Sequence, residues 1–207
     1  LYRVTKDGGV VVWVVNDATL NGSETGTSFR QALYFKEIGF NLHDTMIWEK
    51  PTFTATGSLR VRYAPVFEYM FVFSKGKPKT FNPIKDRPNK YRGTKKHGTV
   101  RQTDGSTKDI SSKGKEIAEF GQRFNVWRIS PEKNNKTGHP APFPEQLAHD
   151  HIISWSNEGD TVLDPMCGSG TTLKMAYLNN RNFIGIDYSE EYVKLSQERL
   201  EEIAKKE

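Results

Sequence analysis

One run of nine residues has the types and spacing of a ligand-binding loop: Asp164-Pro165-Met166-Cys167-Gly168-Ser169-Gly170-Thr171-Thr172. Two glycines separated by one residue allow a tight turn and a close approach of the backbone to a ligand. The apolar residues 161–163 predict a strand before the loop, and residues 173–178 predict a helix after it. The free N–H groups and the positive dipole end of that helix would face a carboxylate or a phosphate. We therefore predict a cofactor loop.

The spacing of this loop narrows the class of cofactor. A dinucleotide-binding loop needs a third glycine three residues after the second, where this chain has Leu173. A P-loop needs Gly-Lys-Ser/Thr after four spacer residues, and the nearest lysine, Lys174, falls in the predicted helix. A second predicted strand, 182–187, ends in Asp187. One acid after each strand suits S-adenosylmethionine, with Asp164 facing the ammonium and Asp187 the ribose hydroxyls. The alternative is an ordinary strand, turn and helix without a ligand.

Three segments resemble the DNA amino-methyltransferases, which modify N4 of cytosine or N6 of adenine. They are the loop itself, Asn-Phe-Ile-Gly-Ile-Asp-Tyr-Ser-Glu-Glu-Tyr at 182–192, and Gly-His-Pro-Ala-Pro-Phe-Pro-Glu-Gln-Leu at 138–147. The third is similar to the segment that closes over the methionine end of the cofactor in this family, and its prolines favour an extended wall before a helix begun by Pro144. The resemblance implies S-adenosyl-L-methionine as cofactor, bound by the loop residues together with Asp187, Tyr188, His139, Pro140, Ala141 and Phe143.

The order of the motifs resembles the β class of these enzymes, because the cofactor loop lies near the C-terminus and follows a basic, loop-rich segment. In that class a catalytic tetrapeptide, Asp or Ser followed by Pro-Pro and an aromatic residue, precedes the other motifs. No Pro-Pro dipeptide occurs in the 207 residues. We therefore assign no catalytic residue within the chain and expect the motif upstream of Leu1, which puts the activity of the isolated chain in doubt.

The elements around the loop predict an α/β fold, a doubly wound and mostly parallel sheet of the methyltransferase type. The apolar run 10–15 indicates a fully buried central strand. Strands at 46–48 and 69–73 have no helical pattern between them, which predicts an antiparallel pair at one sheet edge. The remaining expected elements are a strand at 125–129 and helices at 28–38, with Phe29, Ala32, Leu33, Phe35 and Ile38 as apolar members, at 145–155, and at 190–206 packing against the sheet.

Positive charge is concentrated in one part of the chain. Between Lys75 and Lys115 there are thirteen Lys or Arg against three acids, a local excess of ten positive charges in a chain of net charge +5. Such asymmetry indicates a segment that faces a polyanion. We expect three parts: 1–74 and 125–207 as the catalytic-side and cofactor-binding halves of the methyltransferase domain, and 75–124 as an inserted target-recognition region.

Double-stranded DNA is the partner that this segment and the resemblance imply. Lys and Arg would neutralise phosphates, and a subset such as Arg87, Arg92 or Arg101 would reach guanine edges. A solvated insertion without a specific role is the alternative. The residues that we expect to contact DNA are Arg60, Arg62, Lys85, Arg87, Arg92, Lys95, Lys96 and Arg101.

Other compositional features exclude or disfavour several classes of site. The single cysteine, Cys167, excludes an internal disulfide and is expected to be a small buried filler. The resemblance and the lack of partner acids or thiols favour structural or helix-surface roles for His139, His149 and His151, so we expect no metal site. No apolar run reaches the length of a membrane-spanning helix. The resemblance implies a cytoplasmic enzyme encoded by a bacterium or a phage, with no membrane partner.

The resemblance implies a site-specific DNA methyltransferase that acts on the exocyclic amino group of a flipped base. The form of residues 139–144 favours N4 of cytosine slightly over N6 of adenine. Two other classes stay open: a non-catalytic fragment that binds the cofactor or DNA, and a methyltransferase acting on RNA or a small molecule. A cognate restriction endonuclease is a further partner in keeping with the family.

Overall fold

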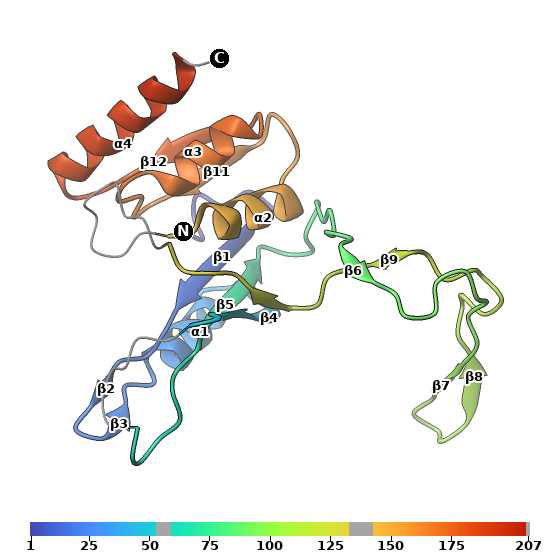
Figure 1. Cartoon of the computed structure of the whole chain (residues 1–207). Helices are drawn as coiled ribbons and strands as arrows, with labels where there is room; N and C mark the ends of the chain where they lie inside the picture. The colour runs from blue at the N-terminus through green and yellow to red at the C-terminus, as the bar shows by residue number, and fades with distance from the viewer. Residues whose placement is uncertain (53–58, 133–142, 206–207) are drawn as a thin grey trace. The chain divides into compact units, whose positions relative to one another are not determined.

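The structure is a computed structural model that describes residues 1–52, 59–132 and 143–205. Two compact units make up the chain (Figure 1). The larger comprises Leu1–Asn82 and Asn125–Glu207, and the smaller comprises Pro83–Phe124. The smaller unit falls within the predicted recognition region 75–124, while residues 75–82 belong to the larger unit.

A mixed four-stranded sheet forms one part of the larger unit. Its order is β1 (Val10–Val15), β5 (Phe67–Ser74), β4 (Asn41–Glu49) and β10 (Val126–Arg128). β5 runs antiparallel to both neighbours, and β10 is parallel to β4. The predicted antiparallel pairing of β4 with β5 is confirmed, but its predicted position at the sheet edge is wrong. β5 lies inside the sheet because β1 pairs with its second edge and β10 pairs with β4.

The two faces of β5 are covered by different helices. Phe71 and Phe73 point to one face and Met70 to the other, as the alternation of a strand requires, and all three are buried. Helix α1 (Thr27–Glu37) covers the first face through Ala32 and Phe35. The Phe35 and Phe73 rings stack with their centroids 4.4 Å apart.

Two apolar residues of α1 do not join this core, contrary to the helical pattern. The buried strip of α1 consists of Ser28, Ala32 and Phe35, spaced one and two turns apart. Phe29 and Leu33 lie beside this strip and are 52% and 60% exposed. The sequence pattern correctly predicted the helix but overestimated the width of its buried face.

The strand β1 is half-buried along its whole length, so its prediction as a fully buried central strand is wrong. Val11, Trp13 and Val15 pack against the core under α1. Within the described part of the chain, β1 pairs with β5 alone.

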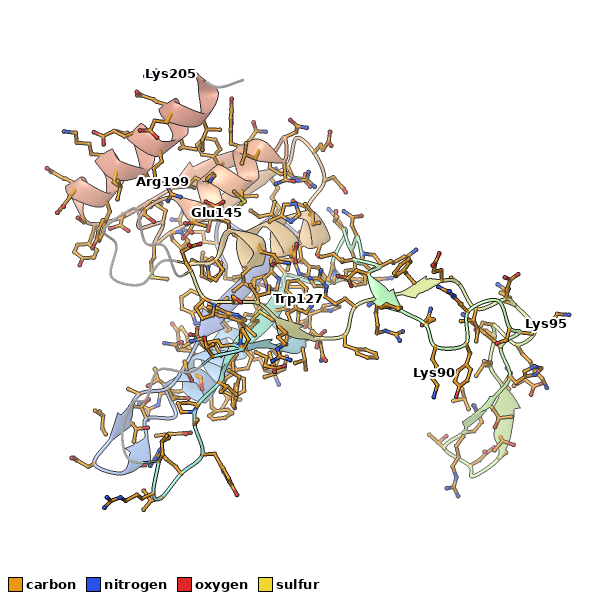
Figure 2. The ribbon with its side chains drawn as sticks, in the orientation of Figure 1. Lys90, Lys95, Trp127, Glu145, Arg199 and Lys205 are labelled. Carbon is orange, nitrogen blue, oxygen red and sulfur yellow. The ribbon has the colours of Figure 1, made fainter. Side chains whose placement is uncertain are left out.

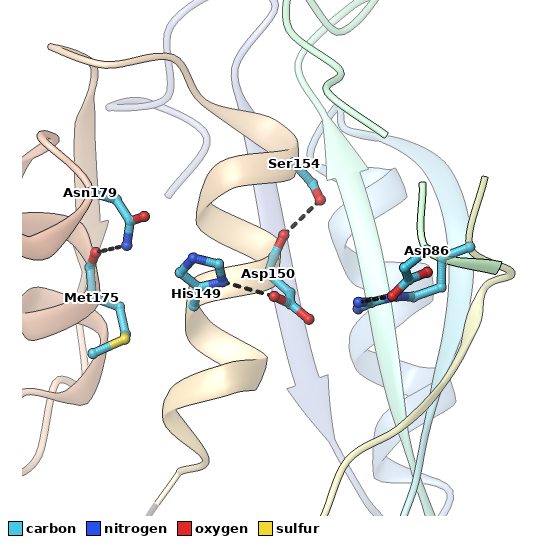
Figure 3. A network of polar contacts seen from close by, with 7 residues as sticks. Asp86, His149, Asp150, Ser154, Met175 and Asn179 are labelled. Carbon is cyan, nitrogen blue, oxygen red and sulfur yellow. Dashed lines mark hydrogen bonds and ion pairs between the residues drawn. The ribbon is translucent and has the colours of Figure 1, made fainter. Parts of the chain in front are cut away.

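Helix α2 (Glu145–Trp155) covers the second face of β5, with the bounds that the sequence predicts. The His151 ring stacks on Trp127 of β10 at 4.4 Å, and its Nε2 lies 3.2 Å from the sulfur of Met70. Figure 3 shows α2 at close range, with Ser154 Oγ donating to the Asp150 carbonyl at 2.6 Å and His149 Nδ1 lying 2.8 Å from Asp150 Oδ1. With helices on both faces of the sheet, the predicted doubly wound α/β fold is confirmed. The four-stranded sheet is mixed, with two antiparallel pairings and one parallel, where a mostly parallel sheet was predicted.

The elements that carry the cofactor loop pack on the other side of α2. β11 (Thr161–Asp164) and β12 (Asn182–Gly185) are parallel, and α3 (Thr171–Leu178) connects them. Ala148 and Ile152 of α2 share a core with Met175 and Ala176 of α3. The final helix α4 (Glu190–Ala204) contacts α3 and presents half-buried apolar side chains, among them Leu195 and Ile203.

The remaining strands are short. β2 (Thr19–Leu20) and β3 (Ser23–Glu24) form a hairpin in the larger unit. The smaller unit contains β6 (Arg87–Pro88), β7 (Thr99–Arg101), β8 (Thr107–Asp109) and β9 (Phe120–Gly121). In the part of the chain that the structure describes, no helix is long and apolar enough to cross a membrane.

Candidate functional site

The two acids singled out in the sequence lie at the same end of one parallel pair of strands. Asp164 is the last residue of β11 and pairs with Gly185 of β12, two residues before Asp187. The Ile186 amide donates to the Asp164 carbonyl at 2.9 Å, and the Cys167 amide donates to the Ile186 carbonyl at 2.9 Å. Ligands of open α/β sheets bind at this carboxyl end of the strands. The cofactor loop is therefore bonded directly to the segment that carries the second acid.

Both carboxylates help to shape the loop. Asp187 accepts the Gly168 amide at 2.8 Å on Oδ2 and the Ser189 amide at 2.9 Å on Oδ1. Asp164 accepts the Met166 amide at 3.1 Å on Oδ1. A carboxylate oxygen can accept more than one hydrogen bond, so these contacts leave capacity for a ligand.

The exposed surface beside the acids fits a cofactor with an ammonium, a ribose and a flat base. Met166, two residues after Asp164, is 64% exposed, and Tyr188, directly after Asp187, is 99% exposed. The two carboxylates suit a cation and sugar hydroxyls, and the adaptable Met and aromatic Tyr side chains suit a planar apolar group. The predicted residues thus have the chemistry that S-adenosylmethionine requires.

The glycines of the loop serve different purposes. Gly168 and Gly170 have positive φ angles of 49° and 78°. A Cβ atom on Gly170 would lie 2.7 Å from Cβ of Ser196 in α4. The sequence predicts that this glycine lets a ligand approach the backbone, but the structure shows that α4 fills the space beside it. Gly185, which the sequence did not single out, is crowded in the same way by Leu173 of α3 at 2.4 Å.

Several loop side chains are buried within the protein. Cys167, Ser169 and Thr171 are no more than 8% exposed, whereas Pro165 and Thr172 are half-buried. Burial raises the pKa of the Cys167 thiol, and the charges of Asp164 and Asp187 raise it further. The thiol is therefore protonated at neutral pH, and the expected role of Cys167 as a buried filler agrees with this environment.

The third motif is described only in part. His139, Pro140 and Ala141 lie outside the described residues. Phe143 is half-buried against the core of α2 and α3, and its ring lies 6.3 Å from that of Trp48. Pro144 precedes the first turn of α2 and its carbonyl accepts the Leu147 and Ala148 amides at 3.0 and 3.2 Å.

Sequence reasoning missed three charged residues behind the loop: Glu145, Lys174 and Arg199. Lys174 Nζ lies 2.6 Å from Glu145 Oε1, and Arg199 Nη2 lies 3.5 Å from the same oxygen. Figure 2 labels Glu145 and Arg199. Arg199 Nη1 also donates to the Ser169 carbonyl and, at 3.2 Å, to Ser169 Oγ. The only sequence signal for this cluster was the acid in the first turn of α2, because its three members are far apart along the chain.

The smaller unit is a two-stranded antiparallel ribbon. β6 pairs with β9, an isolated bridge joins Lys95 to Glu116, and β7 pairs with β8 toward the tip. No residue of Pro83–Phe124 is buried. Eleven Lys or Arg in this range face five acids, an excess of six positive charges. A two-stranded ribbon fits the width of the DNA major groove, and on its own it is only marginally stable.

The eight residues predicted to contact DNA fall into two groups. Four are engaged within the protein. Arg62 donates to Thr19 Oγ1 and the Gly22 carbonyl at 3.1 and 2.8 Å. Arg92 pairs with Glu119 at 3.0 Å, Arg87 lies 4.4 Å from the Phe124 ring, and Arg60 has an intramolecular interaction of its own.

The other four, Lys85, Lys95, Lys96 and Arg101, form no salt bridge with any residue that the structure describes. Figure 2 labels Lys95 on the ribbon, and Lys95 and Arg101 are exposed. Their charges are available to an external anion. The structure thus separates cations that shape the protein from cations that are open to a polyanion.

Two solved structures have a similar fold. Residues covering 94% of the chain superpose on 64% of PvuII DNA methyltransferase (cytosine-N4-specific) with a TM-score of 0.68 and 21% identity. The M1.HpyAVI–SAM complex matches 94% of this chain over 76% of its own chain, with a TM-score of 0.65 and 24% identity. The fold is that of the DNA methyltransferases.

Sequence relatives define the family more closely. The profile of the DNA methylase family matches residues 1–198. The orphan methyltransferase M.BamHII of Bacillus amyloliquefaciens is 59% identical over 209 residues, which cover 97% of this chain and 77% of that protein. The type II methyltransferase M.MjaI of Methanocaldococcus jannaschii is 30% identical over 97% of this chain and 64% of that protein. The chain belongs to the family of S-adenosylmethionine-dependent DNA methyltransferases.

Proposed function

We propose that the carboxyl ends of β11 and β12 bind S-adenosylmethionine and that the chain directs its methyl group to the exocyclic amino group of a base in DNA. One observation carries this proposal: Asp164 and Asp187 flank a loop whose backbone they both bind, directly before the N-terminus of α3. An amino-acid nucleoside carries an ammonium, ribose hydroxyls and a carboxylate, which match the two acids and the helix N-terminus.

The roles of the residues follow from their positions. The first N–H groups of α3 have no partner within the helix and would bind the methionine carboxylate. Asp164 would face the ammonium, Asp187 the ribose hydroxyls, and Tyr188 and Met166 the adenine. When bound, the cofactor supplies an activated methyl group on a sulfonium. These residues orient it, and the reacting amino group must be held by residues other than those assigned here.

The base that receives the methyl group is proposed to be cytosine, at N4, ahead of adenine at N6. The support is the His-Pro-Ala-Pro-Phe-Pro form at 139–144. The base must leave the stack, because its amino group cannot meet the cofactor inside a duplex, and unstacking costs a few kcal/mol. We propose double-stranded DNA as the substrate rather than RNA or a small molecule, on the strength of the basic ribbon.

The deciding experiment is methyl transfer from labelled S-adenosylmethionine to unmodified genomic DNA by the full-length protein, with the modified base identified by mass spectrometry. We expect N4-methylcytosine. N6-methyladenine would keep the activity and correct the base. Cofactor binding without transfer to DNA, but with transfer to RNA, would overturn the proposed substrate.

We also propose that the ribbon binds DNA through its unpaired cations. Replacing both Lys95 and Lys96 by glutamine should reduce the salt dependence of DNA affinity, lowering the slope of log K against log salt by roughly 0.9 for each phosphate that is no longer neutralised. Lys113→Gln is the matched control, because it also removes ribbon charge but Lys113 is paired with Asp109 at 2.8 Å. The single variants Lys95→Gln and Lys96→Gln each remove one charge, as Lys113→Gln does. A slope for either of them equal to the slope for Lys113→Gln would contradict the proposal.

A further inference from the structure

We infer that Arg199 and Glu145 are positioning residues for the cofactor loop, and this inference rests on the proposed function. Arg199 binds the loop from behind, through its hydrogen bonds to the carbonyl and hydroxyl of Ser169. Ser169 is 5% exposed, so these contacts lie within the protein. A guanidinium offers several donors in a fixed plane, which allows one side chain to hold two acceptors of the same residue.

The hold on the loop extends to the next residue. Ser196, one helical turn before Arg199 on α4, is 4% exposed and occupies the space beside Gly170. Gly170 is the residue before α3, and its carbonyl accepts the Lys174 amide at 2.9 Å. α4 thus fixes the two residues that precede the first free N–H groups of α3. Those N–H groups are the proposed partners of the cofactor carboxylate.

Glu145 fixes the orientation of Arg199 and connects the loop to a second element. Its Oε1 lies within 3.5 Å of Arg199 and 2.6 Å of Lys174, so one carboxylate joins α2, α3 and α4. The side chains of Arg199 and Lys174 are only 19% and 23% exposed, which limits screening by solvent. Glu145 is also the first residue of α2, directly after the segment 138–144 that resembles the wall over the cofactor.

The charges of this cluster allow positioning to be distinguished from simple attraction. Two cations and one carboxylate leave one net positive charge behind the carboxylate site. If the cluster acted only through its field, neutralising Glu145 would leave two positive charges and would tighten binding of an anionic group. If it acts by holding the loop, the same change weakens binding because Arg199 and Lys174 lose their shared partner.

The test measures binding of S-adenosylmethionine to variants of the full-length protein by calorimetry. Arg199→Met should raise the Kd about tenfold, since it removes hydrogen bonds made by a charged group. Arg199→Lys should give an intermediate Kd, and Glu145→Gln should raise the Kd roughly three- to tenfold. In steady state the KM for the cofactor should rise, while the KM for DNA and the kcat at saturating cofactor stay close to wild type.

Glu198→Gln is the matched control, because it neutralises an acid on the exposed side of α4 that pairs with Lys194 at 3.9 Å. It should leave the Kd unchanged. Glu145 is 42% exposed at its side chain, so Glu145→Gln tests the inference even where Arg199→Met lowers stability. Tighter or unchanged cofactor binding in Glu145→Gln would overturn the inference alone. A wild-type protein that binds no S-adenosylmethionine would overturn the proposed function together with it.

Discussion

Replacing Asp187 by alanine is expected to weaken S-adenosylmethionine binding by about a hundredfold or more, because it would remove the charged acceptor that we propose for two ribose hydroxyls. The weakening has a second cause in the free protein. Asp187 also accepts the amides of Gly168 and Ser189, so its removal releases the loop from the segment after β12. Asp187→Asn keeps one acceptor oxygen, so its cofactor affinity should fall between those of the wild type and Asp187→Ala. The measurement is the Kd by isothermal titration, with circular dichroism to confirm the fold.

Asp160 supplies a matched control for this prediction. Like Asp187, it accepts a backbone amide, that of Asn157 at 2.7 Å. It stands next to β11, but at the opposite end of the strand. Asp160→Ala therefore removes the same charge and the same kind of hydrogen bond from the same pair of strands. It should leave cofactor affinity within about twofold of wild type. If Asp160→Ala and Asp187→Ala reduced affinity equally, the effect would reflect stability of the strands and not a ligand contact.

The parts of the site that sequence could predict are those encoded by neighbouring residues. Each acid directly follows its own apolar strand, and the parallel pairing of β11 with β12 then brings the two acids together. The helix α2 was predicted with its observed bounds because Pro144 precedes it and its apolar residues recur at helical spacing. These signals need no knowledge of distant contacts.

The parts that sequence could not predict depend on residues far apart in the chain. Arg199 meets Ser169 across 30 residues, and nothing in either local sequence indicates the other. The position of β5 inside the sheet depends on β1, which comes more than fifty residues earlier. Likewise, residues 83–124 have weak periodicity because a ribbon with no buried residue imposes no apolar alternation. Its register comes from backbone pairing that composition does not encode.

Gly170 illustrates how the structure changes the expected result of a mutation. Taken alone, the sequence of the loop predicts that replacing Gly170 abolishes cofactor binding and leaves the fold largely intact. The structure places a new Cβ 2.7 Å from Cβ of Ser196, at a backbone φ of 78°. A non-glycine residue at such a φ costs roughly 1–2 kcal/mol, and overpacking adds typically about 1–3 kcal/mol. The expectation of an intact fold is therefore replaced by one of a destabilised α4.

Gly170→Ala is expected to lower the free energy of unfolding by about 2–5 kcal/mol and to weaken cofactor binding at the same time. Gly159→Ala is the matched control, because Gly159 has a φ of 81° but no atom within 4 Å of its Cβ position. It should cost only the backbone strain of about 1–2 kcal/mol. Chemical denaturation measures both, and equal destabilisation of the two variants would show that α4 does not press on the loop.

The double variant Gly170→Ala with Ser196→Gly separates the two contributions to that destabilisation. Removing Cβ of Ser196 relieves the shortest contact and leaves its Cα at 3.2 Å, while the strain of a positive φ remains. Relative to Ser196→Gly alone, the double variant should therefore lose little more stability than Gly159→Ala loses relative to the wild type. Its cofactor affinity should partly recover. Recovery of both quantities would show that contact between α4 and the loop controls stability and cofactor binding together. Recovery of stability without affinity would assign Gly170 a separate role at the cofactor.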